Sequence, residues 1–170
     1  MGHAFTDLEG LRIAVEMEKR GEAFYRRAAK ISKAPETVAL LNRLADEEQA
    51  HGARFQALYD RECESQSDAC EEVYDIEVCA YLSAIAADII FPGGLMALRQ
   101  TGFENPEAVL RCAIDSEKDS ILFYAELSAR AHDAHARAVF DEIARQEREH
   151  MLRLQAQLEN LRADCAPLEY

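Results

Sequence analysis

Apolar side chains recur in two stretches of the chain with the spacing of one face of an α-helix. The first stretch carries, at alternating steps of three and four residues, Leu41, Leu44, Glu48, His51, Phe55 and Leu58. The second carries Phe140, Ile143, Glu147, His150 and Leu154 at the same steps, and Leu161 follows two helical turns later. The period is that of a helix and not of a strand. Two glutamates and two histidines therefore lie on helix faces that we expect to be buried.

These stretches belong to an internal repeat in which matching residues stand 99 positions apart. Such self-similarity indicates a structural unit that is used twice. The matched pairs include Leu11 and Leu110, Glu18 and Glu117, Tyr25 and Tyr124, Glu48 and Glu147, and His51 and His150. As a result, Glu18 precedes Glu48 by the same 30 residues that separate Glu117 from Glu147.

The start and stop signals in each copy of the repeat predict a pair of helices. Thr6 can cap the first helix while Glu9, three residues later, completes a capping box. Pro35 disfavours helical geometry in the residue before it and suits the first turn of a second helix. In the second copy, Asn105 followed by a proline is a similar start signal, and a break near Asp133 separates the last two helices.

The two helix pairs are expected over about residues 6–64 and 105–163, which makes an all-α four-helix bundle. The connector, about residues 65–104, is long for a loop, and 73–90 has enough apolar residues for a short extra helix. Such a length lets the second pair dock parallel to the first, because the chain must travel back along the bundle. We expect residues 1–170 to form one domain.

Composition and charge narrow the functional classes. Only 7 glycines and 4 prolines among 170 residues favour helices over turn-rich sheets. A formal net charge of −13 repels phosphate backbones, so we expect no nucleic-acid partner, and it attracts metal cations. The longest apolar stretch, 78–91, is too short to cross a bilayer, so we expect no membrane partner. The five cysteines form no Cys-x-x-Cys pair, which is typical of free thiols in the cytoplasm.

The inward-facing acidic and imidazole groups predict a metal site. Burying carboxylates without partners is costly, and several at close range cannot all stay ionised unless cations neutralise them. No lysine or arginine lies on the inward stripes, whereas two divalent ions would balance four carboxylates. In each Glu-x-x-His motif the two side chains lie one helical turn apart and point the same way. We therefore predict one two-metal site with six ligands: Glu18, Glu48, His51, Glu117, Glu147 and His150.

A single Glu-x-x-His motif on a helix is weak evidence, because a surface pair explains most instances. Two copies, each 30 residues after a matched glutamate and each on an apolar stripe, are far more specific. The alternative is that the six side chains are merely hydrogen-bonded polar groups. Mixed oxygen and nitrogen ligands favour iron or manganese, although zinc binds them readily.

Neighbouring polar residues are weaker candidates. Tyr25 and Tyr124 follow Glu18 and Glu117 by seven residues on the same helix face. They are either core aromatics whose hydroxyls need a partner or residues that hold a ligand in place. Off the stripes or near helix boundaries, we expect solvent exposure for Glu47, Glu149, His3, His132 and His135.

With these motifs the sequence resembles the rubrerythrin-like branch of the ferritin-like superfamily, over roughly 110 of 170 residues. The resemblance rests on Glu18…Tyr25…Glu48-x-x-His51 and Glu117…Tyr124…Glu147-x-x-His150. It implies a ferritin-like bundle with two iron ions. Glu48 and Glu147 would bridge them. Glu18 and His51 would complete the coordination of one ion, and Glu117 and His150 that of the other.

The resemblance also implies a function, although the sequence departs from the family's pattern in two places. It implies a di-iron oxidoreductase that reduces peroxide or oxidises ferrous iron with oxygen or peroxide. Ser120 stands where rubrerythrins carry an additional glutamate, which puts their redox-linked iron movement in doubt. The chain also lacks their rubredoxin domain, so electrons must come from an external donor such as a rubredoxin-like protein. The alternatives are an iron storage or transfer protein with incidental ferroxidase activity and a structural bundle with an idle metal site.

Apolar residues in the connector predict a homodimer. One small bundle does not readily cover them, and an exposed apolar patch marks an interface. The alternative is that this segment caps its own bundle. The residues concerned are Tyr81, Leu82, Ile85, Ile89, Ile90 and Phe91.

Overall fold

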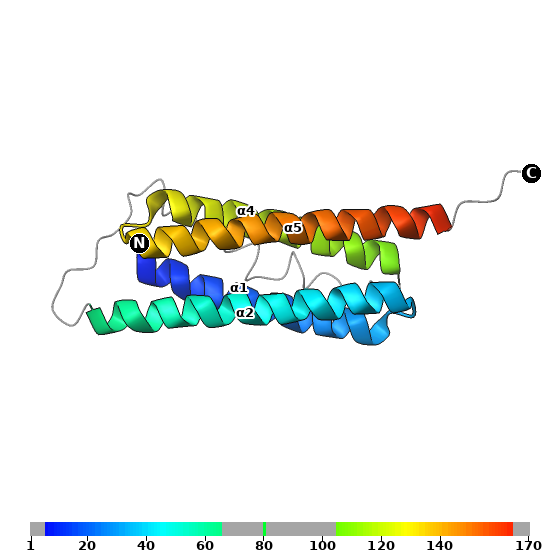
Figure 1. Cartoon of the computed structure of the whole chain (residues 1–170), viewed down its shortest axis with the longest axis horizontal. Helices are drawn as coiled ribbons and strands as arrows, with labels where there is room; N and C mark the ends of the chain where they lie inside the picture. The colour runs from blue at the N-terminus through cyan, green and yellow to red at the C-terminus, as the bar shows by residue number, and fades with distance from the viewer. Residues whose placement is uncertain (1–5, 66–79, 81–104, 165–170) are drawn as a thin grey trace, which may run out of the picture.

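A computed structural model describes residues 6–65, 80 and 105–164, and these residues form four long helices (Figure 1). The elements are α1 (Asp7–Ile31), α2 (Pro35–Ser65), α4 (Pro106–Arg130) and α5 (Ala134–Asp164). All four helices of the two predicted pairs are present, and their observed ends differ from the predicted ones by only a few residues. The all-α bundle of two helix pairs is thus confirmed.

The helices begin at the capping residues that the sequence indicated. The Thr6 hydroxyl accepts a hydrogen bond from the Glu9 amide at 3.1 Å. The Asn105 side chain accepts from two amides of the first turn of α4, with proline at the start of that helix. The Asp133 carboxylate accepts from the Ala136 amide at 2.7 Å and starts α5. Capped ends satisfy amides that would otherwise lack partners, which fixes where each helix begins.

The bundle is made of two closely packed hairpins. Helix α1 packs along α2, and α4 along α5, whereas α2 with α5 and α1 with α4 approach one another less closely. Figure 1 shows the α1–α2 hairpin lying alongside the α4–α5 hairpin with the helix axes nearly parallel. The wider space between the hairpins has to be filled by side chains, and this is where the inward stripes meet.

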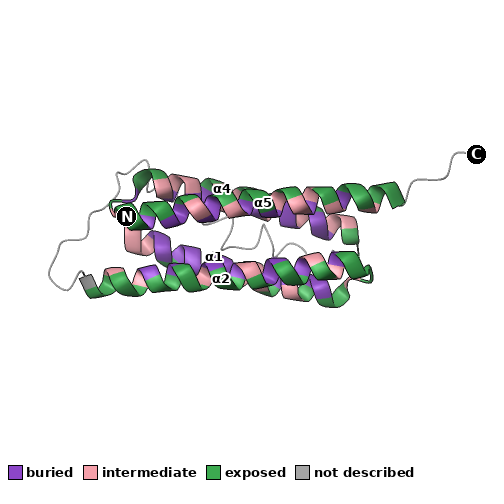
Figure 2. Ribbon diagram, viewed as in Figure 1, coloured by how far each residue is buried: buried purple, intermediate pink, exposed green. Residues whose placement is uncertain are grey.

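Two apolar clusters fill the core and leave its middle to polar residues. One cluster contains Leu11, Phe55, Phe123, Phe140 and Ile143. The other contains Phe24, Leu41, Leu44, Leu110 and Leu154. Buried residues lie mainly on the faces that the helices turn toward one another (Figure 2). Between the clusters in sequence, on every helix, lie the buried acidic and imidazole residues.

Some expectations fall on residues outside those described. The extra helix over 73–90 and the apolar residues behind the predicted dimer belong to this group, so both stay predictions, as does the single-domain assignment. Cys63 and Cys112 are free thiols. Among the described residues, no helix is both long and apolar enough to cross a membrane.

Candidate metal centre

Six buried side chains from all four helices converge at the middle of the bundle. Helix α1 contributes Glu18, α4 contributes Glu117, and α2 and α5 each contribute one Glu-x-x-His pair. Each of the six residues is at most 5% exposed. The structure therefore brings together all six residues of the predicted site: Glu18, Glu48, His51, Glu117, Glu147 and His150.

The six residues form two overlapping groups of four. Within each group, one potential ligand atom per residue lies within 4.8 Å of all the others. The groups have Glu48 and Glu147 in common. The first adds Glu18 and His51, and the second adds Glu117 and His150. This is the division expected of two ions that share two bridging carboxylates.

The two histidines face the shared glutamates in a symmetric manner. His51 Nδ1 lies 2.9 Å from Glu147 Oε1, and His150 Nδ1 lies 2.8 Å from Glu147 Oε2. The two imidazole rings stack with centroids 5.4 Å apart and planes inclined by 13°. His150 Nδ1 is also 3.2 Å from Glu48 Oε1. Each histidine thus presents its Nδ1 atom to the centre of the cluster.

Several of these atoms lack a well-directed hydrogen bond within the protein. They are Glu18 Oε2, both carboxylate oxygens of Glu147, and the Nδ1 atoms of His51 and His150. They come close to one another, but their lone pairs converge instead of pointing at donors. Buried polar groups are nearly always satisfied, and the exceptions call for an explanation. A cation at the point of convergence would satisfy all of them, so the residues present fit a dinuclear metal site.

Each buried tyrosine holds a glutamate of the opposite hairpin. The Tyr124 hydroxyl donates to Glu18 Oε1 at 2.5 Å, and the Tyr25 hydroxyl donates to Glu117 Oε1. Burial raises the pKa of both tyrosines well above its usual range, and the facing glutamate charges raise it further. The phenols therefore keep their protons and act as donors. Each fixes one oxygen of its glutamate and leaves the other oxygen free to face the cluster.

The outward nitrogen of each histidine also has a partner, and here the sequence interpretation was incomplete. Glu47, which we expected to be exposed, is partly buried and lies with Oε2 2.9 Å from His150 Nε2. Gln146 places Oε1 2.7 Å from His51 Nε2. The two residues stand at matched positions of the repeat, directly before the Glu-x-x-His motifs. That adjacency was the available signal, because a residue one position before a buried one can reach around the helix edge.

In the ion-free protein, bound protons reduce the repulsion among the carboxylates of the cluster. Burial raises the pKa of Glu48 well above its usual range, and the nearby Glu147 charge adds to this. Burial raises the pKa of Glu117, and the nearby Glu147 charge raises it further, to about 8. Burial alone would lower the pKa of His51, but the close carboxylates of Glu147 and Glu18 raise it to about 10.

His150 and Glu147 complete this proton network. Burial opposes the charging of His150 as well, yet the close carboxylates of Glu117 and Glu147 raise its pKa to about 9. Burial would likewise raise the pKa of Glu147, but the positive charges of the two histidines beside its oxygens lower the pKa below its usual range. The ion-free cluster therefore holds protons at neutral pH that a metal ion would displace.

A small cavity opens onto the cluster between α1 and α4. Its volume is about 20 Å³, and its lining includes the cluster residues Glu18, Glu48 and Glu117 together with Gly21 and Ser120. A cavity needs roughly 10–15 Å³ to hold a water-sized molecule. A Cβ atom on Gly21 would lie 3.3 Å from Glu48 Oε2, so glycine keeps this wall open. One small molecule can thus reach the carboxylates.

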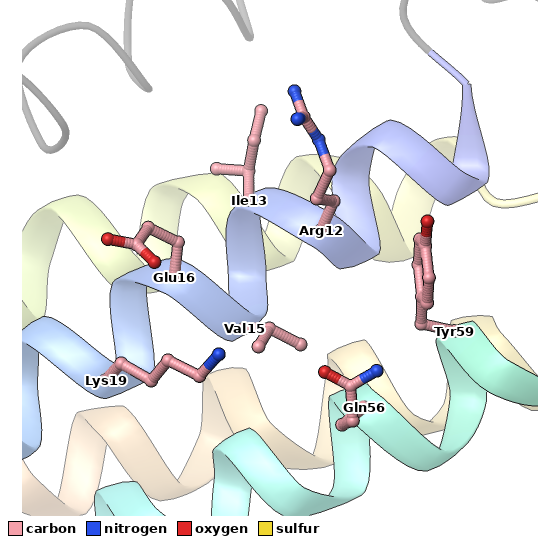
Figure 3. A pocket seen from close by; sticks show the side chains of 7 residues that line it. All are labelled: Arg12, Ile13, Val15, Glu16, Lys19, Gln56 and Tyr59. Carbon is pink, nitrogen blue, oxygen red and sulfur yellow. The ribbon is translucent and has the colours of Figure 1, made fainter.

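Other candidate features lie apart from the cluster. His132 and His135 are exposed, as is Glu149, which confirms the expectation for these three residues. A larger groove of about 450 Å³ lies between α1 and α2, lined by Arg12, Glu16, Lys19, Gln56 and Tyr59 among others (Figure 3). It contains none of the six cluster residues.

The fold and the site together define a class: a ferritin-like four-helix bundle with a buried carboxylate and histidine cluster. Known structures agree with this class. A ferritin-like diiron-carboxylate protein from Thermotoga maritima superposes with a TM-score of 0.68 at 26% identity, covering 94% of this chain and 98% of that one. A hypothetical protein from Pyrococcus furiosus has the same fold, with a TM-score of 0.64 at 23% identity, covering 91% and 89%.

Sequence comparison narrows the class to a family. The sequence model of the rubrerythrin family matches residues 4–73 and 107–169. The chain belongs to the rubrerythrin family. No curated protein matches it with significance.

Proposed function

We propose that the protein is a di-iron oxidoreductase that reduces peroxide, or oxidises ferrous iron with oxygen or peroxide, at the six-residue cluster. The observation that carries the proposal is the pair of overlapping four-residue groups, buried and sharing Glu48 and Glu147. Membership of the rubrerythrin family supports iron as the metal. Manganese and zinc fit the same ligand types and are the alternatives.

The four carboxylates and two imidazoles would hold two divalent ions. Glu48 and Glu147 belong to both groups and are the bridging candidates. Glu18 and His51 would complete the coordination of one ion, and Glu117 and His150 that of the other. Four ionised carboxylates balance the four charges of two divalent ions, so the loaded core carries no net charge and its burial is no longer penalised.

Two bound ferrous ions would supply the two electrons that convert one hydrogen peroxide and two protons into two waters. The protein's own residues bind the ions, orient the carboxylates and enclose the site. Tyr25 and Tyr124 each hold one oxygen of a terminal glutamate, which keeps the other oxygen aimed at the cluster. The apolar clusters on both sides keep bulk water from the site. The small cavity beside Ser120 admits a molecule of the size of peroxide or oxygen but not a large substrate.

The electrons must be replaced by an external donor after each turnover. The sequence holds no Cys-x-x-Cys pair that could bind a rubredoxin-type iron centre. A separate rubredoxin-like protein is the donor that we propose, with a small reductant as the alternative. We also propose that the protein is cytoplasmic and a homodimer, for the reasons of cysteine usage and connector composition given above.

The test is a rapid-mixing experiment on protein loaded with two ferrous ions per chain without oxygen. Separate mixing with hydrogen peroxide and with oxygen gives the rate of iron oxidation by each. Faster oxidation by peroxide supports peroxide reduction, whereas faster oxidation by oxygen with many irons retained per chain supports storage. His135→Ala, at an exposed histidine outside the cluster, is the control and should behave as the wild type. Failure to bind two ions per chain would contradict the proposal.

A further inference from the structure

The two halves of the cluster have the same inner residues but different outer partners. His150 Nε2 faces the Glu47 carboxylate at 2.9 Å, and His51 Nε2 faces the Gln146 amide oxygen at 2.7 Å. Both contacts cross from one hairpin to the other. Residues 47 and 146 occupy matched positions, so the repeat has placed a carboxylate in one half and its neutral isostere in the other.

The partners of Gln146 fix its orientation. Its amide nitrogen donates to Glu142 Oε1 at 2.6 Å. An ionised carboxylate can only accept, so the amide group must turn its nitrogen toward Glu142 and its oxygen toward His51. His51 Nε2 must then carry the hydrogen, which leaves the Nδ1 lone pair for the cluster.

The partners of Glu47 fix the other histidine in the same tautomer. Arg153 Nη2 donates to Glu47 Oε2 at 2.7 Å, and Arg43 Nε donates to Oε1 at 3.1 Å. Both guanidinium groups form ion pairs with Glu47, which holds it as a carboxylate. Since a carboxylate accepts only, His150 Nε2 carries the hydrogen and Nδ1 faces inward. The two imidazoles therefore differ in the charge of the acceptor and not in tautomer.

The acceptor's charge changes how well an imidazole binds a metal ion. A hydrogen bond from the imidazole to a carboxylate is stronger than one to a neutral amide and leaves more electron density on the opposite nitrogen. Behind Gln146, Glu142 acts on His51 only through the amide.

We propose that Glu47 makes the two metal positions unequal, so that the ion beside His150 binds first and more tightly than the ion beside His51. The inference rests on the proposed dinuclear site and deepens it. Glu47 is a positioning residue, because it acts through His150 and not on the ion itself. Residues of this kind change metal affinity by about 10–100-fold when they are removed.

The test uses zinc as a redox-silent probe and protein in which the histidines carry nitrogen-15. Binding of zinc at Nδ1 moves that nitrogen's NMR resonance, and the His51→Gln variant assigns which resonance belongs to which histidine. At one zinc equivalent, the wild type should show the His150 resonance moved and the His51 resonance unchanged. The second equivalent should then move His51, with an affinity lower by about 10-fold.

Glu47→Gln copies the other half of the repeat onto this one. In this variant both resonances should move together at one equivalent, and the affinity for the first ion should fall by about 10-fold. Glu149→Gln is the matched control, because it removes the same charge from an exposed residue that pairs with Arg145 and not with a histidine. It should keep the order of filling found in the wild type.

The possible outcomes separate this inference from the proposed function. Two zinc ions that fill both positions equally in the wild type would overturn the role of Glu47 but leave the dinuclear site standing. Unequal filling that persists in Glu47→Gln would also overturn it. Wild-type protein that binds fewer than two ions would overturn the dinuclear site itself.

Discussion

The two hairpins of this bundle are alike where they face the cluster and different one layer further out. Each contributes one terminal glutamate, one Glu-x-x-His pair and one tyrosine that holds the other hairpin's glutamate. Outside this layer, position 47 is a glutamate and position 146 a glutamine. Gly21 likewise faces the cavity from a position whose match is Ser120.

The difference shows which features the site itself requires. Two ions of equal charge need equal ligands, so the inner residues of the two halves are the same. In the proposed site the outer residues would set how strongly each ion is held and what can approach it, and these residues differ between the two halves. A repeat thus supplies a symmetric site whose two positions can be adjusted separately.

The largest expected effect comes from removing a shared carboxylate. Glu48→Ala and Glu147→Ala each delete a residue that belongs to both groups, so each variant should lose dinuclear binding entirely. The hairpins should be equivalent in this respect. Metal content after equilibrium dialysis, measured beside His135→Ala, checks the prediction. Two ions bound at wild-type affinity in either variant would contradict the shared role of that residue.

Metal should stabilise the fold strongly near neutral pH. An ion at a hundredfold excess over its dissociation constant contributes about 2.7 kcal/mol, which raises the melting temperature of a chain of this size by roughly 5–10 °C. The effect should be greater at pH 8 than at pH 5, because protons compete for the ligands at low pH. Calorimetry of loaded and ion-free protein measures it, and equal melting temperatures at pH 7 would contradict the site.

The ion-free protein should itself lose stability as the pH rises. The pKa of Glu117 is raised from 4.5 to about 8, so its contribution is complete below about pH 4.5 and is lost as the pH rises through 8. The raised pKa of His51 acts in the same sense, with its contribution complete below 6.5 and lost through about 10. The lowered pKa of Glu147 acts oppositely, and its contribution is lost in acid. Chemical denaturation of ion-free protein between pH 5 and pH 9 measures the trend. Stability that rises over this range would contradict it.

Replacing either buried tyrosine should lower the unfolding free energy by a smaller amount, similar in the two hairpins. Tyr25→Phe and Tyr124→Phe each leave one buried glutamate oxygen without its donor, which costs about 1–3 kcal/mol of unfolding free energy. Because the two contacts are related by the repeat, the losses should be similar. Urea unfolding of both variants decides this, and a loss confined to one tyrosine would show that the hairpins are not equivalent here.

The fold and the inner site could be predicted because each depends on a repeated, local signal. Helix ends follow from Thr6, Pro35 and Asn105, whose side chains or rings act on the nearest turn. The six ligands follow from a period that places them on one stripe of each helix. Periodicity indicates which face a residue occupies, and for an acidic residue on an apolar face few explanations other than a cation are available.

The outer contacts could not be predicted because they depend on the distance between the hairpins. Glu47 lies beside the stripe, and the sequence alone does not show that His150 of the other hairpin comes within 2.9 Å of it. The same holds for the cavity beside Gly21, which depends on how closely α1 approaches α4. Both follow from the spacing of helix axes, which hydrophobic pattern does not encode.

Anomalous X-ray diffraction at the iron absorption edge, from crystals loaded with ferrous iron without oxygen, tests the central claim most directly. The account predicts two peaks per chain, about 3.5–4 Å apart, both flanked by Glu48 and Glu147. One peak should lie beside Glu18 and His51 and the other beside Glu117 and His150. A single peak, or iron found only at surface carboxylates, would contradict the dinuclear site.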